Sequence, residues 1–245
     1  MIYTTGDTHG NIDIKDISET TLKKQNIQLT ENDYLVILGD FGLPFLNKDI
    51  DDYNNKKGSY RHWINWLKNK PYTVLWIDGN HDNFDYWENQ PVSEKFGGKV
   101  QIHPHAENVI HLMRGEIYRI ENKSIFTFGG AESTDKIFRT PHISWWEQEA
   151  ATDDEIANAI KNLTRYGYKV DYVFTHTPPR AVCAAAGYSD TYDKTAAFLN
   201  EMMFRIKYKA WFAGHLHKEF RLIMSKMCVQ YHSVENTETI EESFA

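Results

Sequence analysis

The sequence predicts an α/β protein, and two observations lead to this prediction. In the first half of the 245-residue chain, short apolar runs rich in β-branched and aromatic residues alternate with stretches of helical periodicity. This alternation is typical of strands layered with helices. After His217 two strands are expected, at Phe220–Met224 and Cys228–Val234, joined by a turn at Ser225-Lys226. A β-rich end indicates a second sheet rather than further strand–helix–strand units.

Six further runs have the composition of buried strands. Each ends in Gly, Asp or Thr and is followed by polar residues, as strands that run into loops do. The six are Ile2–Thr5, Tyr34–Leu38, Thr73–Ile77, Ser124–Phe128, Asp171–Thr175 and Ala210–Ala213.

Three helices are expected between these strands. The clearest begins after Thr152, which can cap it, and its first turn is acidic, as the positive end of a helix favours. Ile156, Ile160 and Leu163 fall on one face, and Gly167 is a suitable C-terminal cap. The other two helices are expected at about Asp190–Lys209, where Phe198, Met202 and Ile206 are four apart, and at Tyr60–Asn69.

The composition is that of one ordinary globular domain, expected to span residues 1–245. Hydrophobic residues make up 41% and charged residues 25%, and no apolar run approaches the ~20 residues that span a bilayer. The start, Met1–Thr5, lacks the basic and apolar regions of a signal peptide. We therefore expect a cytoplasmic protein without membrane contact, in which Cys183 and Cys228 are reduced thiols. The acidic segment near Glu235–Glu242 is expected to be a solvated end.

The formal charge of −7 argues against a protein that binds nucleic acid regardless of sequence, because such proteins need a basic face. It does not exclude an anionic substrate. Two divalent cations held by only two carboxylates would leave a locally positive pocket.

Five clusters of Asp, Asn, Gly and His each close an apolar run. They are Gly6-Asp7-Thr8-His9, Gly39-Asp40-Phe41-Gly42, Gly79-Asn80-His81-Asp82, Thr175-His176 and Gly214-His215-Leu216-His217. Carboxylate oxygen, amide oxygen and imidazole nitrogen are the ligands that divalent metals use. One such cluster alone is most simply a turn. Five of them at strand ends predict a metal site, because one edge of an α/β sheet collects such ends.

The order of these five motifs resembles that of the calcineurin-like metallophosphoesterase superfamily, over nearly the whole chain from Asp7 to His217. The resemblance implies a four-layer α/β/β/α sandwich of two mixed sheets. It also implies a dinuclear metal site at the C-terminal edge of the strands. The two divalent ions are expected to be manganese ahead of iron, zinc, nickel or magnesium.

The resemblance also assigns a role to each motif residue. One ion would be held by Asp7, His9 and His217 and the other by Asn80, His176 and His215, with Asp40 bridging them. A hydroxide bound to the metals would attack the phosphate, and His81 would protonate the leaving group. The assignment is chemically consistent, since two ions bind the phosphoryl oxygens and histidine titrates in the useful range.

The pattern departs from the protein Ser/Thr phosphatase branch of that superfamily. Where that branch has Asp-Arg, this chain has Leu43 and Pro44, so the carboxylate that orients the histidine and the arginine that grips the phosphate are both missing. Asp82 also replaces a Glu of that branch. A dianionic monoester benefits most from the missing arginine. A phosphodiester or nucleotide-like substrate is therefore expected, with short single-stranded nucleic acid also considered.

Three alternatives stay open at this point. They are a phosphomonoesterase acting on a small molecule or a phosphoprotein, a non-catalytic scaffold that binds a partner, and a nuclease subunit. The sequence does not indicate an oligomeric state.

Substrate contacts are expected outside the five motifs as well. The segment 129–149 carries Arg139, Trp145 and Trp146, and resembles a stretch in a bacterial and phage subgroup of the superfamily. The tryptophans are expected either to pack in the core or to form a wall for a base or sugar. Arg139 is a candidate substrate ligand, or else it pairs with Asp135 or Glu132, and Arg180 is a second candidate. His103, His105 and the more distant His111 are expected on a surface turn.

Overall fold

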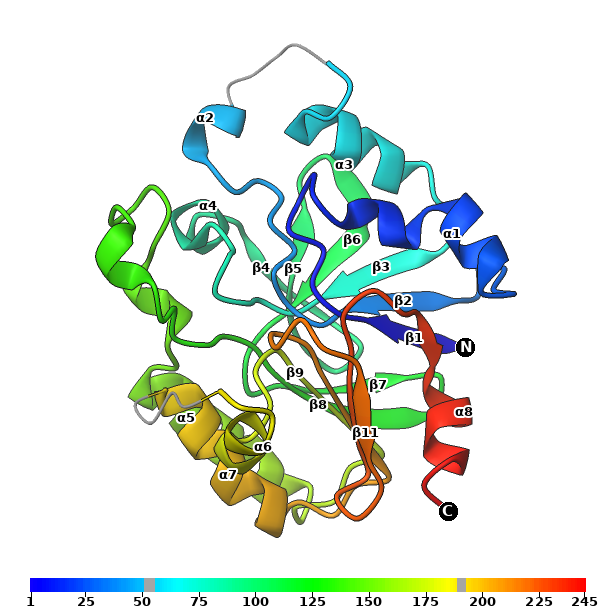
Figure 1. Ribbon diagram of the computed structural model, residues 1–245, viewed down its shortest axis with the longest axis vertical. Coiled ribbons are helices and arrows are strands. Elements are labelled where there is room, and N and C mark those ends of the chain that lie inside the picture. The colour runs from blue at the N-terminus through cyan, green and yellow to red at the C-terminus, as the bar shows by residue number, and fades with distance from the viewer. Residues whose placement is uncertain (51–55, 189–192) are drawn as a thin grey trace.

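The computed structural model describes residues 1–50, 56–188 and 193–245 and confirms the predicted layers (Figure 1). Two mixed sheets face each other, and helices cover the outer face of each. The first sheet has the order β13 (Glu235–Asn236), β1 (Ile2–Thr5), β2 (Tyr34–Ile37), β3 (Thr73–Trp76), β6 (Ala106–Leu112), β5 (Gly98–His103) and β4 (Val92–Lys95). The second sheet has the order β11 (Phe220–Leu222), β12 (Met227–Val229), β10 (Ala210–Ala213), β9 (Tyr172–Thr175), β8 (Lys123–Phe128) and β7 (Ile117–Ile120).

The helices fall into two groups, one on each sheet. Figure 1 shows α1 (Glu19–Lys24) and α3 (Tyr60–Lys68) beside the first sheet, and α5 (Asp153–Arg165), α6 (Arg180–Ala185) and α7 (Lys194–Arg205) beside the second. The remaining elements are the helices α2 (Asn47–Ile50), α4 (Phe84–Glu88) and α8 (Thr237–Glu242), and the 3₁₀ turns η1 (Ile14–Ile17), η2 (Lys136–Phe138) and η3 (Glu147–Glu149).

All eight predicted strands are present, although several are shorter than predicted. Strand β2 shows why such runs are apolar throughout. Leu35 and Ile37 pack in the core beneath α1 and α3, whereas Val36 belongs to the core between the sheets. A strand buried on both faces has no polar alternation. The β-rich end also forms as predicted, because β11 and β12 pair antiparallel in the second sheet.

The predicted helices are present with small differences in length. In α5 the Thr152 side chain accepts a hydrogen bond from the Glu155 N–H, and the predicted cap Gly167 has φ 61°. Leu163 on its inner face is fully buried. Helix α7 begins at Lys194 behind the cap Asp193, and the earlier start predicted for it lies outside the described residues. Helix α3 ends one residue before the predicted end.

The prediction of a solvated acidic end was wrong. The segment pairs with β1 through β13 and then forms α8. Ile240 is fully buried between the sheets, and the Tyr172 hydroxyl donates to Glu241 at 2.7 Å. The acidic residues lie on one face of a helix whose other face is apolar, so the charge run alone was misleading.

The prediction of a surface turn was wrong for two of its three histidines. His103 is buried, with its Nε2 2.9 Å from the Tyr60 hydroxyl, and only His105 is exposed. His111 lies in β6 with its Nε2 3.1 Å from Asp78 Oδ1.

Cys183 and Cys228 are both buried free thiols. Among the helices of residues 1–50, 56–188 and 193–245, none has both the length and the apolar character needed to cross a bilayer.

A buried ion pair joins the layers beneath the end of β3. Arg114 donates to Asp78 Oδ2, and its Nη1 donates at 3.2 Å both to the Ala150 carbonyl and to Glu155. Burial alone would raise the pKa of Asp78, but the charge of Arg114 holds it far below its ordinary value. The loop before α5 is thereby fastened to the strand that leads into Gly79-Asn80-His81.

Arg114→Met is expected to lower the free energy of unfolding by about 3–5 kcal/mol, since it leaves the Asp78 carboxylate buried without its arginine partner and with only His111 beside it. Urea denaturation at pH 7 measures the loss. Lys209→Met is the matched control, because Lys209 pairs with Asp171 while remaining 49% exposed, and such pairs contribute about 0–1 kcal/mol. Equal losses in the two variants would contradict a special role for the buried pair.

Candidate metal centre

The five motifs meet at one edge of the sandwich, where strands of both sheets end. The first sheet contributes three of them, after β1, β2 and β3, and the second sheet contributes two, after β9 and β10. Their metal-ligand candidates are Asp7, His9, Asp40, Asn80, His176, His215 and His217.

Four of these residues form one compact group. Asp7, His9, Asp40 and His217 each offer one ligand atom, and these atoms lie within 4.8 Å of one another. His9 Nε2 lies 3.3 Å from Asp40 Oδ2, and His217 Nε2 lies 3.2 Å from Asp7 Oδ2. This spacing leaves room for a cation between oxygen and nitrogen donors.

The other three candidates are adjacent to that group. His176 Nε2 lies 3.0 Å from Asn80 Oδ1 and 3.2 Å from His215 Nδ1. It is also 3.4 Å from Asp40 Oδ1. The Asp40 carboxylate therefore faces both groups, with one oxygen toward each.

Hydrogen bonds behind two of the rings direct their other nitrogen into the cluster. His176 Nδ1 lies 2.8 Å from the Leu38 carbonyl, which can only accept. His9 Nδ1 lies 2.9 Å from Asp13 Oδ2. A ring that donates through Nδ1 presents an Nε2 lone pair to the cluster, which is how metal-binding histidines are usually held. The five motifs do not include Asp13, and its position four residues after His9 does not by itself mark it as a partner of that ring.

The electrostatics of the cluster call for a cation. Asp7 Oδ2 is buried, and despite its distance to His217 it makes no hydrogen bond. Burial alone would lower the pKa of His9, but the hydrogen bond and charge of Asp40 raise it to about 9. Burial and the neighbouring His176 lower the pKa of His215 to about 3. A buried carboxylate oxygen without a hydrogen bond, close to several imidazole nitrogens, fits a divalent metal.

The backbone of the cluster is strained. Four of the candidate ligands adopt the left-handed conformation, with φ 43° at His9, 50° at Asp40, 69° at His215 and 47° at His217. Each such residue costs about 1–3 kcal/mol and persists only where its surroundings enforce it. Strain of this kind is concentrated at functional sites. At Gly39, with φ 101°, a side chain would also collide with the His176 ring.

His81 lies beside the candidate ligands without being one of them. Its backbone N–H donates to Asp40 Oδ1 at 2.7 Å, and its ring Nδ1 lies 2.9 Å from Arg139 Nη1. Burial lowers the pKa of His81, and the charge of Arg139 adds to that effect against the pull of Asp40.

Of the two arginines expected near substrate, only Arg139 reaches the site. Its Nε donates to Asp135 at 2.7 Å, so the predicted ion pair is present as well. Arg180 is exposed at the start of α6, and among the described residues no hydrogen bond or ion pair joins it to the cluster. A substrate contact for Arg180 stays a prediction.

Asp82, directly after His81, is a buried carboxylate. It accepts hydrogen bonds from the N–H groups of Gly42 and Gly79, each at 2.7 Å. Burial and the charge of Asp40 raise its pKa to about 7. The residue therefore ties the loops after β2 and β3 together.

The two tryptophans of the 129–149 segment have different environments. Trp146 is buried, which agrees with the core alternative, and its ring lies edge-on to Phe45 with centroids 6.0 Å apart. Trp145 is half-buried at the rim of a cavity of about 250 Å³.

Asp13→Ala is expected to weaken divalent-metal binding by about 10–100-fold, because the His9 ring loses the group that orients it. Calorimetric titration of the metal-free protein with Mn²⁺ measures the change. Asp13→Asn keeps an acceptor oxygen and should recover part of the affinity, and Asp154→Ala, an exposed change on α5, should have none of the effect. Unchanged affinity in Asp13→Ala would contradict an orienting role.

The chain resembles a known family and two solved structures. The family model described as calcineurin-like phosphoesterase matches residues 1–219. No curated protein matches the sequence. One similar structure is a putative 5'-nucleotidase from Staphylococcus aureus in complex with alpha-ketoglutarate, with 12% identity and a TM-score of 0.49, over 95% of this chain and 49% of that one. This chain thus spans about half the length of that protein. Another is phosphopantetheinyl hydrolase from Mycobacterium tuberculosis, with 14% identity and a TM-score of 0.45, over 94% and 87% of the two chains.

Proposed function

The chain belongs to the calcineurin-like phosphoesterase family, and on that premise we propose that it is a binuclear metal-dependent hydrolase of a phosphodiester or nucleotide-like phosphate ester. One observation carries the proposal: seven oxygen and nitrogen donors from both sheets meet at one edge of the sandwich. Among them is the buried Oδ2 of Asp7, which makes no hydrogen bond. Residues 1–245 are proposed to work as a single domain.

The proposed ligand sets follow the two groups in the cluster. Asp7, His9 and His217 would hold one ion, and Asn80, His176 and His215 the other. Asp40, which faces both groups, would bind both. Two divalent ions, manganese in the first instance, supply Lewis-acid activation of the phosphoryl group and of the attacking water.

The remaining chemistry belongs to side chains beside the metals. His81 is positioned to protonate the departing oxygen, because its backbone is fixed by Asp40 while its ring faces outward toward Arg139. Arg139 is proposed to hold a phosphoryl oxygen. Its charge is already shared with Asp135, so it would favour a singly charged diester over a dianionic monoester more than a free arginine would.

Arg139→Met is expected to lower kcat/KM by about 10- to 100-fold, the effect of losing a hydrogen bond to a charged group. Steady-state kinetics with a chromogenic phosphodiester measures it. Arg165→Met, an exposed change in the last turn of α5, is the matched control. A loss below twofold would show that Arg139 does not grip the substrate.

The function itself is tested by comparing two chromogenic esters in the presence of Mn²⁺. Bis-p-nitrophenyl phosphate is expected to be hydrolysed with the higher kcat/KM, and EDTA should abolish the activity. A preference for p-nitrophenyl phosphate by an order of magnitude would favour the phosphomonoesterase alternative. No turnover of either ester with Mn, Fe, Zn, Ni or Mg would favour a non-catalytic scaffold.

A further inference from the structure

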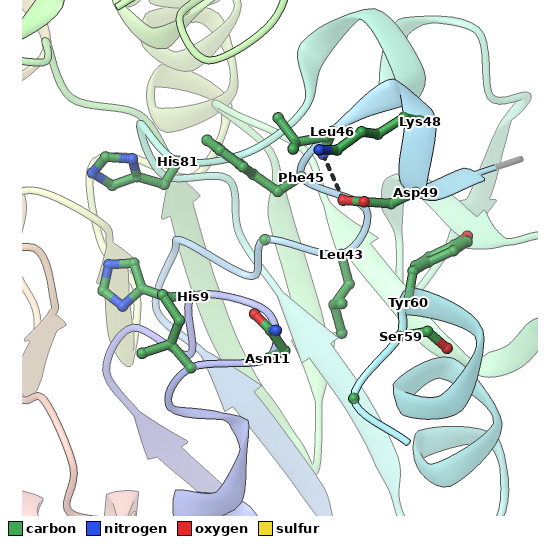
Figure 2. A pocket seen from close by; sticks show the side chains of 13 residues that line it. His9, Asn11, Leu43, Phe45, Leu46, Lys48, Asp49, Ser59, Tyr60 and His81 are labelled. Carbon is green, nitrogen blue, oxygen red and sulfur yellow. Dashed lines mark hydrogen bonds between the residues drawn. The ribbon is translucent and has the colours of Figure 1, made fainter. Parts of the chain in front are cut away.

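A cavity of about 460 Å³ opens beside the candidate metal centre, on the side of His9 and His81 (Figure 2). Its walls come from the loops after β1 and β2, the start of α2 and the turn into α3. Pockets that hold small organic ligands have volumes of about 300–1,000 Å³.

The described part of the wall is mainly apolar away from His9 and His81. Ile12, Leu43, Phe45 and Leu46 line it, and the charges of the adjacent Lys48 and Asp49 are opposite in sign. Tyr60 also lines the cavity, but its hydroxyl is already hydrogen-bonded to Tyr86 at 3.2 Å and to His103 at 2.9 Å. Such a wall suits an uncharged organic group rather than a second phosphate.

Phe45 gives the cavity a flat face next to the reacting groups. Its ring centroid lies 6.3 Å from that of His81, and on another side the ring meets the buried Trp146. Figure 2 shows the Phe45 side chain next to His81, with Leu46 beyond it. A ring fixed in this way can stack against a planar group of a ligand.

The position of the cavity relative to His81 decides which half of an ester it can hold. In an in-line displacement the entering and leaving oxygens are on opposite sides of phosphorus. The leaving oxygen is the one beside the proton donor. A second cavity, of about 470 Å³, borders the cluster on the other side, near His215, and its mixed lining includes Glu132, Lys136 and Leu216. The cavity next to His81 is therefore on the leaving-group side.

We propose that the cavity of Leu43, Phe45 and Leu46 binds the alcohol that is released on hydrolysis, and that this alcohol carries an uncharged body with an apolar or aromatic ring. The inference rests on the proposed function. The bond from phosphorus to the alcohol oxygen breaks, a water oxygen forms the new bond to phosphorus, and His81 gives the departing oxygen its proton.

Methyl 3-phenylpropyl phosphate tests the proposal, because one diester offers two primary alcohols of similar acidity. With Mn²⁺ present, the wild-type protein should release 3-phenylpropanol about 10- to 100-fold faster than methanol, the discrimination that an apolar pocket provides. In Phe45→Ala the release ratio should fall markedly. Phe204→Ala, which removes the same side chain from a position 78% exposed on α7, should keep the wild-type ratio.

A binding measurement separates the two proposals. In saturation-transfer NMR, 3-phenylpropanol should bind the metal-free wild-type protein, bind Phe45→Ala more weakly, and bind far better than 1-propanol. Equal release of the two alcohols by an active enzyme, or no binding of 3-phenylpropanol, would overturn the pocket assignment and leave the hydrolase intact. Failure to hydrolyse any ester, bis-p-nitrophenyl phosphate included, would overturn the proposed function instead.

Discussion

Asp40→Ala protein is expected to purify with little divalent metal and to hydrolyse phosphate esters at background rate. Asp40 is the residue on which both ligand groups depend, with Oδ2 3.3 Å from His9 and Oδ1 3.4 Å from His176. Burial alone would raise its pKa, but the charge of His176 and the contacts with His81 and His9 hold it well below the ordinary range. The side chain is therefore a carboxylate at every pH of interest. Its loss should weaken metal binding by at least the ~100-fold that outer-shell changes reach.

Metal content by mass spectrometry and thermal unfolding with and without Mn²⁺ measure this expectation. The wild-type protein should be stabilised by saturating Mn²⁺, by about 2.7 kcal/mol at one hundred times the dissociation constant, whereas Asp40→Ala should show no such gain. Asp154→Ala, exposed on α5, should behave as the wild type. If Asp40→Ala retains two ions per chain, Asp40 is not the shared ligand.

His81→Ala is expected to keep its metal ions and lose about 10²–10⁴-fold in kcat, the usual contribution of a positioned proton donor. The ring is not needed to build the cluster, because the contact between His81 and Asp40 is made by the backbone N–H at 2.7 Å. The loss should be smaller for p-nitrophenyl esters than for alkyl esters, since p-nitrophenolate departs without a proton more readily.

Metal analysis and kinetics on both kinds of ester measure this result, with His105→Ala as the exposed-histidine control. A rate near that of the wild type on alkyl esters would remove His81 from the leaving-group role. Loss of metal together with activity would instead place His81 among the groups that hold the ions.

The strands that the sequence predicted correctly are those whose burial is visible in their residue types. The strands β1, β2, β3, β9 and β10 are buried on both faces, so they appear as short continuous apolar runs, and each is followed at once by its motif. The strands β4 to β7 were missed. All four residues of β4 are exposed, so the strand has no apolar run. The strands β5 and β6 flank the turn at Pro104, and the histidines there were interpreted as part of a surface turn.

The sequence predicted which residues form the site, but not the contacts that support them. The motifs give the seven donors, but nothing local indicates that Asp13 supports His9 or that Asp82 joins two loops through Gly42 and Gly79. Arg139 lies 58 positions from His81 in sequence. Contacts of that range follow from how the chain folds back, and a single sequence does not encode them in any short pattern.

Because both sheets contribute metal ligands, the metal site affects how the protein unfolds. A divalent ion held between the ends of β1–β3 and those of β9 and β10 would act as a cross-brace between the two halves of the sandwich. A small displacement of one sheet relative to the other would break the metal–ligand contacts before any strand unfolds. Metal affinity should therefore decline at lower denaturant concentration than the far-ultraviolet circular dichroism signal. It should report how tightly the two sheets pack against each other.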